Sequence, residues 1–126
     1  MDLNINDLKS VGISFRKAQY IKNVYEYFSK STFDFLSASN ESVTEELTKI
    51  KGIGKWSSEM FLMFVLMRIN IFSKGDLALM NSIKINYKID VKDDYKLNSL
   101  VESWSPYKSV ASLLLWKSIE EKYFFS

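Results

Sequence analysis

The feature of this sequence that most constrains its fold is a pair of glycines, one residue apart, between two segments of helical character. The stretch LTKIKGIGKW (residues 47–56) predicts a helix, a tight turn and the start of a second helix. Gly52 and Gly54 allow the backbone to turn where a Cβ atom would clash. Asp76, in the stretch FSKGDL (residues 72–77), follows the predicted end of that second helix. The sequence therefore predicts a helical hairpin followed by a carboxylate.

The amide groups at the hairpin turn predict a binding site for an anion. N–H groups at the start of a helix have no partner within it, and the helix dipole adds partial positive charge. Lysines on both sides of the turn add full charges. A DNA phosphate would fit such a site, although glycines that only end one helix and permit a turn to the next explain the same pattern. The predicted phosphate contacts are Gly52, Ile53, Gly54, Lys51 and Lys55.

The rest of the chain predicts an all-α fold. Apolar residues recur at helical spacing, without a sustained period-two pattern typical of strands. Ser14 is predicted to cap the first helix, and Asn40 or Ser42 the second. Between these helices, Phe33 and Leu36 are predicted to enter the core. The predicted helices cover residues 15–28, 42–50, 55–69, 77–85 and 94–102, and a last helix begins with Ser105 as its N-cap and Pro106 at its first position.

Four stretches of the chain, in order, resemble motifs of one known superfamily. They are LKSVGISFRKA (residues 8–18), IKGIGKW (50–56), FSKGDLAL (72–79) and WSPYKSVA (104–111), the last closing with Leu115 and Trp116. They resemble the helix-hairpin-helix superfamily of DNA glycosylases, in which a Gly/Pro-rich loop ends in an aspartate. Within it, the chain most resembles DNA-3-methyladenine glycosylase II, the alkylation-repair branch. The resemblance covers nearly the whole chain from residue 8 onward and implies an all-α helix-hairpin-helix glycosylase domain.

Asp76 is the candidate catalytic residue. From the residues alone, an aspartate after a glycine at a helix start predicts an N-cap. The resemblance implies a further role, because the matching aspartate of the family faces the sugar of the flipped nucleotide. It stabilises positive charge as the glycosidic bond breaks, or helps to position water. The two roles are compatible, since a carboxylate at a helix N-terminus is kept ionised.

Trp56 distinguishes two kinds of reaction within the superfamily. Members that also cut the DNA backbone carry a lysine at this position, which forms a Schiff base with the sugar. Lys55 lies one residue away and should point about 100° around the helix from this position, so it is not expected to replace that lysine. The resemblance therefore implies base removal without lyase activity. Trp56, Met60 and Tyr107 are the candidate base pocket, where an indole would suit a cationic alkylated base. A core position for Trp56, in line with Met60, is the alternative.

The composition excludes several cofactors. The chain has no cysteine and no histidine, which excludes disulfides, a four-cysteine iron–sulfur cluster and histidine-ligated zinc. No cofactor is expected to be required. The resemblance implies a structural Na+ or K+ site at the hairpin, held by the main-chain carbonyls of Thr48, Ile50 and Ile53. Ordinary backbone pairing in a turn is the alternative.

The length of 126 residues predicts a single domain, residues 1–126. A net charge of +2 is compatible with a nucleic-acid partner without requiring one. Since no signal peptide or bilayer-spanning apolar run is present, an intracellular protein that binds no membrane is expected. Compared with the family, the domain lacks an upstream segment, as if truncated at its N-terminus. A fragment, a reduced enzyme that pairs with another chain supplying the missing half, and an inactive remnant are the three explanations.

The predicted function is base-excision repair of double-stranded DNA containing damaged bases. The predicted reaction is monofunctional hydrolysis of the N-glycosidic bond of alkylated purines of the 3-methyladenine type, with Asp76 as the essential acid. The alternative is a non-catalytic or remnant helix-hairpin-helix module that only binds DNA. A third interpretation, a structural helical domain, predicts no salt-sensitive affinity for duplex DNA.

Overall fold

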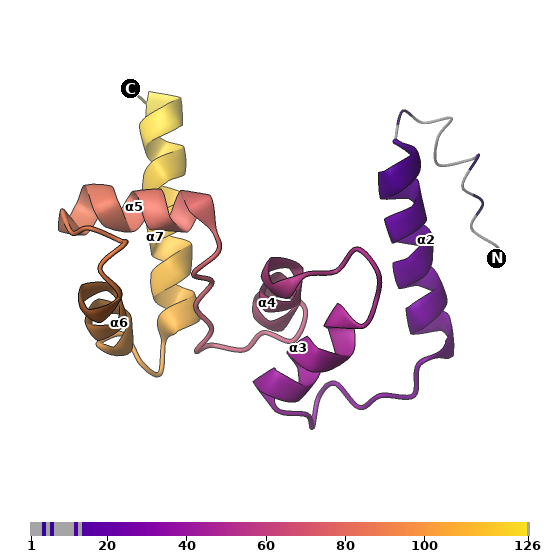
Figure 1. Ribbon diagram of the computed structural model, residues 1–126. Helices are drawn as coiled ribbons and strands as arrows, with labels where there is room; N and C mark the ends of the chain where they lie inside the picture. The colour runs from indigo at the N-terminus through magenta and orange to yellow at the C-terminus, as the bar shows by residue number, and fades with distance from the viewer. Residues whose placement is uncertain (1–3, 5, 7–11, 13, 126) are drawn as a thin grey trace. The chain divides into compact units, whose positions relative to one another are not determined.

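The computed structural model describes residues 4, 6, 12 and 14–125, with side chains as far as residue 120. This part of the chain is helical and contains no strand, which confirms the predicted all-α class. Of the first motif, residues 8–11 and 13 lie outside the described residues. The helices are α2 (Phe15–Lys30), α3 (Asn40–Thr48), α4 (Lys55–Phe64), α5 (Leu77–Tyr87), α6 (Asp94–Glu102) and α7 (Lys108–Phe125) (Figure 1).

The chain divides into two compact units, and the division falls inside α4. The N-terminal unit is Met1–Ser58 and the C-terminal unit is Glu59–Ser126. The N-terminal unit therefore holds α2, α3 and the hairpin, and the C-terminal unit holds the loop with Asp76 and the last three helices. The prediction that residues 1–126 act as a single domain stays a prediction.

The N-terminal unit has buried apolar side chains on both α2 and α3. Ala18 of α2 and Val43 and Leu47 of α3 are buried, together with Ile50 just after α3. Ser14 caps α2 as predicted, because its Oγ accepts a hydrogen bond from the Lys17 N–H. An aromatic cluster in the same unit contains the rings of Tyr27, Phe28, Phe33 and Phe35, whose neighbouring centroids lie 4.7 to 6.4 Å apart.

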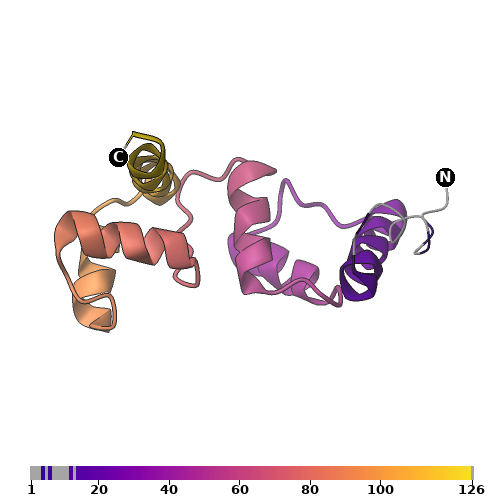
Figure 2. The ribbon, with the colours of Figure 1, turned by 90° about the horizontal axis from the view of Figure 1, so that it is seen from above.

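The C-terminal unit has its core where α5, α6 and α7 meet. Helix α5 packs against α7 and crosses it in Figure 1, whereas Figure 2 shows α7 nearly end-on. Each fully buried aliphatic side chain contributes about 1.5 to 3 kcal/mol relative to exposure. The cluster therefore fixes the three helices around the loop that carries Asp76. Its buried members are Leu79, Ile83, Leu97, Val101 and Leu115, and Trp104 and Trp116 pack against them.

Two predictions about the segment between α2 and α3 are wrong. The N-cap of α3 is Ser39, whose Oγ accepts from the Ser42 N–H, and not Asn40 or Ser42. Serine residues lie at both ends of this interval, so the sequence did not show which one leaves the helical conformation. Leu36 is 81% exposed rather than in the core. Phe35 lies against Phe28 in its place.

Helix α4 ends at Phe64, earlier than the predicted 68–69. The Arg68 N–H donates to the Leu62 carbonyl, and Met67 has a φ of 56°. A left-handed residue that follows the end of a helix is usually a glycine. Because a methionine occupies that position, the sequence carried no visible stop signal.

Helix α7 begins at Lys108, and neither Ser105 nor Pro106 is part of it. The Ser105–Pro106 peptide bond is cis, and the Tyr107 N–H donates to the Trp104 carbonyl across it. The two residues therefore form a turn with a cis proline before the helix. The predicted N-cap at Ser105 is wrong because the chain still turns there.

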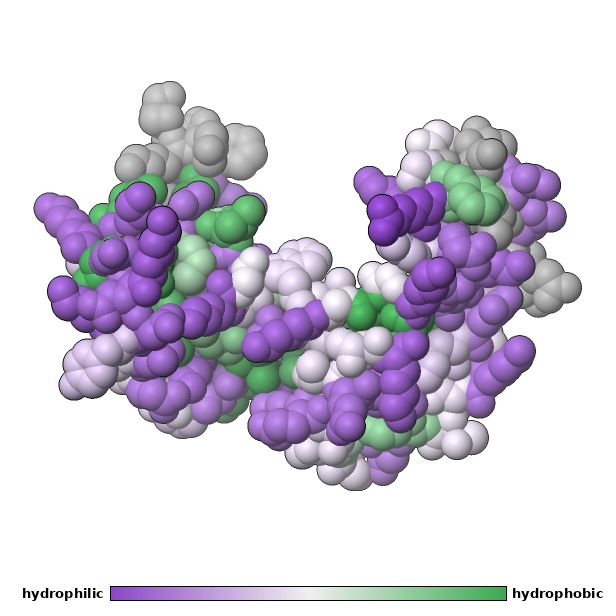
Figure 3. All heavy atoms as spheres, in the orientation of Figure 1, coloured by the Kyte–Doolittle hydropathy of each residue, from purple (hydrophilic) through white to green (hydrophobic). Residues whose placement is uncertain are grey.

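Figure 3 shows hydrophilic side chains over much of the visible face of both units, with hydrophobic ones in smaller patches. In the described part of the chain, no helix is long and apolar enough to span a membrane.

Candidate functional site

The hairpin turn is shaped by Gly52 and by a tyrosine of α2. Gly52 has a φ of 103°, a conformation that L side chains rarely adopt. A Cβ atom at this position would lie 2.4 Å from two carbons of the Tyr20 ring. Gly54 differs, because its φ is not in the left-handed region and a Cβ there would have no neighbour within 4 Å. The fold itself therefore explains the glycine at 52, and nothing inside the fold requires the glycine at 54.

The hairpin amides are used differently from the prediction. The Ile53 N–H donates to the Ile50 carbonyl at 3.0 Å, so this amide closes the turn and is not presented at the helix start. The first hydrogen bond of α4 runs from the Ser58 N–H to the Gly54 carbonyl at 3.1 Å. The amides that precede Ser58, beginning at Lys55, are those that a helix N-terminus presents. The amides presented at the start of α4 thus begin slightly later in the chain than the sequence pattern predicted.

The predicted cation site is compatible with the turn. The Ile50 carbonyl accepts the Ile53 N–H, but a carbonyl oxygen has a second lone pair. No group of three or more acidic, cysteine or histidine side chains that could hold a metal occurs among the described residues. A cation at the hairpin would therefore be held by main-chain oxygens such as those of Thr48, Ile50 and Ile53.

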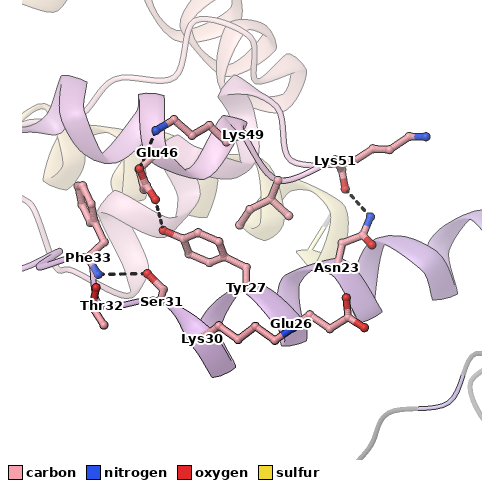
Figure 4. A pocket seen from close by; sticks show the side chains of 11 residues that line it. Asn23, Glu26, Tyr27, Lys30, Ser31, Thr32, Phe33, Glu46, Lys49 and Lys51 are labelled. Atoms are coloured by element: carbon pink, nitrogen blue, oxygen red, sulfur yellow. Dashed lines mark hydrogen bonds and ion pairs between the residues drawn. The ribbon is translucent and has the colours of Figure 1, made fainter.

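Helix α2 also contacts the hairpin through its polar face. The Asn23 Nδ2 donates to the Lys51 carbonyl at 3.1 Å, next to an open cavity of about 660 Å³ (Figure 4). In the same cavity the Tyr27 hydroxyl donates to Glu46 at 2.7 Å, and Lys49 pairs with Glu46 at 3.1 Å. The bond from Tyr27 and then Lys49 lower the pKa of Glu46, while burial and then Glu46 raise the pKa of Tyr27. These contacts tie α2 to α3 and the hairpin.

Asp76 is buried at the N-terminus of α5. Its side chain is 9% exposed, and its Oδ1 accepts the Leu79 N–H at 2.8 Å, so the predicted N-cap is confirmed. The same oxygen accepts the indole N–H of Trp116 from α7 at 3.0 Å. Trp116 in turn stacks on Phe64, with ring centroids 6.0 Å apart. Two donors thus hold the Oδ1 atom of Asp76 in place.

The loop before Asp76 is anchored to α4 by a buried pair that sequence reasoning missed. The Ser73 hydroxyl donates to Glu59 at 3.0 Å, and both residues are buried. The Ser73 carbonyl accepts the Asp76 N–H at 3.2 Å, so Glu59 helps to position Asp76 through Ser73. The sequence did hold one signal for this pair, because Glu59 is the single charged residue in the stretch of residues 56–67.

The predicted pocket residues are accessible rather than core. Trp56 is 49% exposed and Tyr107 is 58% exposed, and Met60 is half-buried. The exposure of Trp56 contradicts the alternative core position, and its role in a base pocket stays a prediction. Trp56 lies in the N-terminal unit with the hairpin, whereas Met60, Asp76 and Tyr107 lie in the C-terminal unit.

This fold is that of the all-helical DNA glycosylases. Several curated proteins and two solved structures that it matches are named 3-methyladenine glycosylases or glycosidases, which confirms the resemblance drawn from the motifs. A DNA-3-methyladenine glycosidase from Bacillus halodurans superposes with a TM-score of 0.76 at 39% identity, over 92% of this chain and 55% of that one. Schizosaccharomyces pombe Mag1, solved in complex with abasic DNA, superposes with a TM-score of 0.80 at 27% identity, over 94% of this chain and 60% of that one.

The sequence comparisons agree with the structural ones. A Bacillus subtilis protein, YfjP, provisionally named a DNA-3-methyladenine glycosylase, is 36% identical over 124 residues, which are 94% of this chain and 43% of that protein. No protein-family model matches the chain. The chain spans about half the length of the curated relatives that it matches.

Proposed function

We propose that this chain carries the hairpin and catalytic aspartate of a DNA-3-methyladenine-type glycosylase, which removes alkylated purines from double-stranded DNA. The observation that carries the proposal is the placement of Asp76, a buried carboxylate held at the α5 N-terminus by the Leu79 N–H and the Trp116 indole. Buried carboxylates are uncommon unless they are hydrogen-bonded, and this one lies at the position that the family motif assigns to catalysis. Its similarity to the solved glycosylases supports the same conclusion.

In the proposed reaction, Asp76 stabilises the transition state electrostatically. The sugar gains oxocarbenium character, and therefore positive charge, as the N-glycosidic bond breaks. An ionised carboxylate opposite the sugar stabilises this positive charge most strongly where water is excluded. The alkylated purine departs with the bonding electrons and leaves as a neutral base, because alkylation has already given the ring a positive charge. Water then adds to the sugar and releases one proton to the solvent, which leaves a hydroxyl group on the sugar carbon. Asp76 needs no covalent bond to the substrate for this step.

The same proposal excludes lyase chemistry. A Schiff base needs a lysine facing the sugar, and the position that supplies it in lyases is Trp56 in this chain. The half-exposed indole can instead stack on a cationic base. Met60 and Tyr107 are the further proposed pocket residues. Substrate specificity of the glycosylase II type rests on these positions and is part of the proposal.

The DNA backbone is proposed to bind at the hairpin. Gly54 has open space around its Cβ position, so a phosphate can approach the backbone, and the first amides of α4 can donate to it. Lys51 and Lys55 are exposed beside the turn. A Na+ or K+ ion on the carbonyls of Thr48, Ile50 and Ile53 would add one more positive charge near the same phosphate; no other cofactor is proposed.

Base release from methylated duplex DNA tests this proposal, with free base and strand breaks measured separately. Asp76→Asn removes the charge but keeps a good N-cap, so we expect a stable protein whose release rate falls about 10²- to 10³-fold. Asp93→Asn is the matched control, because Asp93 caps α6 through the Lys96 N–H and makes the same change in the same unit. We expect it to retain the parent's rate.

The outcomes separate an enzyme from a binding module. Free base from the parent and from Asp93→Asn, with no enzymatic strand breaks, supports the monofunctional glycosylase. DNA binding by all three proteins with no base release from any would refute catalysis by this chain alone. It would favour the alternative, a non-catalytic module that only binds DNA.

A further inference from the structure

Arg16, in the first turn of α2, is an exposed cation that the hairpin mechanism does not use. Its Nε donates to the Tyr20 hydroxyl at 2.8 Å, and its guanidinium carbon lies 5.8 Å from the centre of the Tyr20 ring. Two contacts to one residue hold the side chain in a defined position. An exposed arginine held in this way loses less conformational entropy when it binds a further ligand.

Tyr20 connects this arginine to the hairpin. The base of its ring lies against Gly52, where a Cβ atom would be 2.4 Å away. The hydroxyl at the other end of the ring accepts the hydrogen bond from Arg16. The guanidinium therefore lies about one tyrosine ring away from the hairpin backbone, within the same compact unit.

The charge of Arg16 is not neutralised within the described residues. Their ion pairs involve Lys22, Lys49, Lys74 and Lys108, and none involves Arg16. Only the Nε–H is used by Tyr20, and a guanidinium has four further N–H donors in a planar fork. That geometry matches the two oxygens of a phosphate.

We infer that Arg16 is a second DNA phosphate anchor, held by Tyr20 beside the hairpin so that it contacts a phosphate next to the one at the start of α4. This inference rests on the proposed binding of DNA at the hairpin. In this arrangement, the arginine and the tyrosine of α2 have separate roles. Arg16 supplies charge, and Tyr20 positions it while its ring supports the turn at Gly52.

The salt dependence of DNA binding tests this assignment. Affinity for a duplex with a tetrahydrofuran abasic-site analogue would be measured by fluorescence anisotropy at several KCl concentrations, with no need for base release. Arg16→Gln should weaken binding roughly tenfold and reduce the slope of log affinity against log salt by about 0.9, the loss of one phosphate contact. Lys22→Gln is the matched control. Lys22 lies about 120° around α2 from Arg16, pairs with Glu26, and should leave both quantities unchanged.

Tyr20→Phe separates positioning from charge. This variant keeps the ring on Gly52 and the charge of Arg16 but removes the hydroxyl, so we expect weaker binding with the parent's salt slope and melting temperature. If the parent binds and Arg16→Gln has the same slope as Lys22→Gln, the inference is wrong while DNA binding at the hairpin stands. If the parent itself shows no salt-dependent affinity, both the inference and the proposed DNA-binding role are wrong.

Discussion

Replacing Gly52 with alanine should destabilise the protein by about 3 kcal/mol. Two costs add at this position. An L residue at a φ of 103° costs roughly 1 to 2 kcal/mol, and a Cβ atom 2.4 Å from the Tyr20 ring must displace that ring, at about 1 to 3 kcal/mol. The contact is at the base of the ring, whose hydroxyl end is bonded to Arg16, so the ring cannot simply swing aside.

Thermal unfolding followed by circular dichroism measures this effect, with Gly54→Ala as the matched control. We expect Gly52→Ala to lower the melting temperature by roughly 10 °C. Gly54→Ala should change stability by less than about 0.5 kcal/mol, because its φ is ordinary and no atom lies within 4 Å of the new Cβ. The same control should weaken DNA binding, since the methyl group would stand where a phosphate approaches.

A double-mutant cycle isolates the steric part of the cost. Tyr20→Ala removes the ring that Gly52→Ala would strike, so the alanine at 52 should be less costly in that background by 1 kcal/mol or more, a coupling of ordinary size for residues in contact. Equal melting temperatures for Gly52→Ala and Gly54→Ala, or additive effects in the cycle, would refute this reasoning about the hairpin.

Two further predictions concern polar contacts. Trp116→Phe keeps an aromatic ring but removes the N–H that donates to Asp76, so single-turnover base release should fall about tenfold or more while DNA affinity is unchanged. Trp104→Phe, the same change at a packed tryptophan of the same unit, should retain the rate, and equal losses in both would argue against a positioning role. Tyr27→Phe should destabilise the protein at neutral pH, because the bond from Tyr27 is the main cause of the lowered pKa of Glu46. That stabilisation is complete above the ordinary Glu46 pKa of 4.5 and is lost as the pH falls through the lowered native value, so unfolding measured against pH should show the two proteins converging in acid.

Much of the candidate site could be predicted from the sequence because its signals are local. A glycine at a turn, a serine before a helix and an aspartate at a helix start act through neighbours three or four residues away. Gly52, Ser14 and Asp76 accordingly have the predicted roles in the fold. The C-terminus of α4 and the N-terminus of α7 were missed because no local sequence signal marks them. Met67, rather than a glycine, is the left-handed residue after α4, and a cis peptide bond precedes α7.

The sequence alone determined the helical class, the hairpin and the position of the acid in the chain, because helical periodicity and capping are short-range. The tertiary structure alone decided which distant groups reach them. Trp116 meets Asp76 across 40 residues of chain, Asn23 meets the Lys51 carbonyl across 28, and the Tyr20 ring lies on Gly52. Such contacts depend on how α2 and α7 pack against their partners, and packing is cooperative over the whole core, so no local pattern in the sequence specifies them.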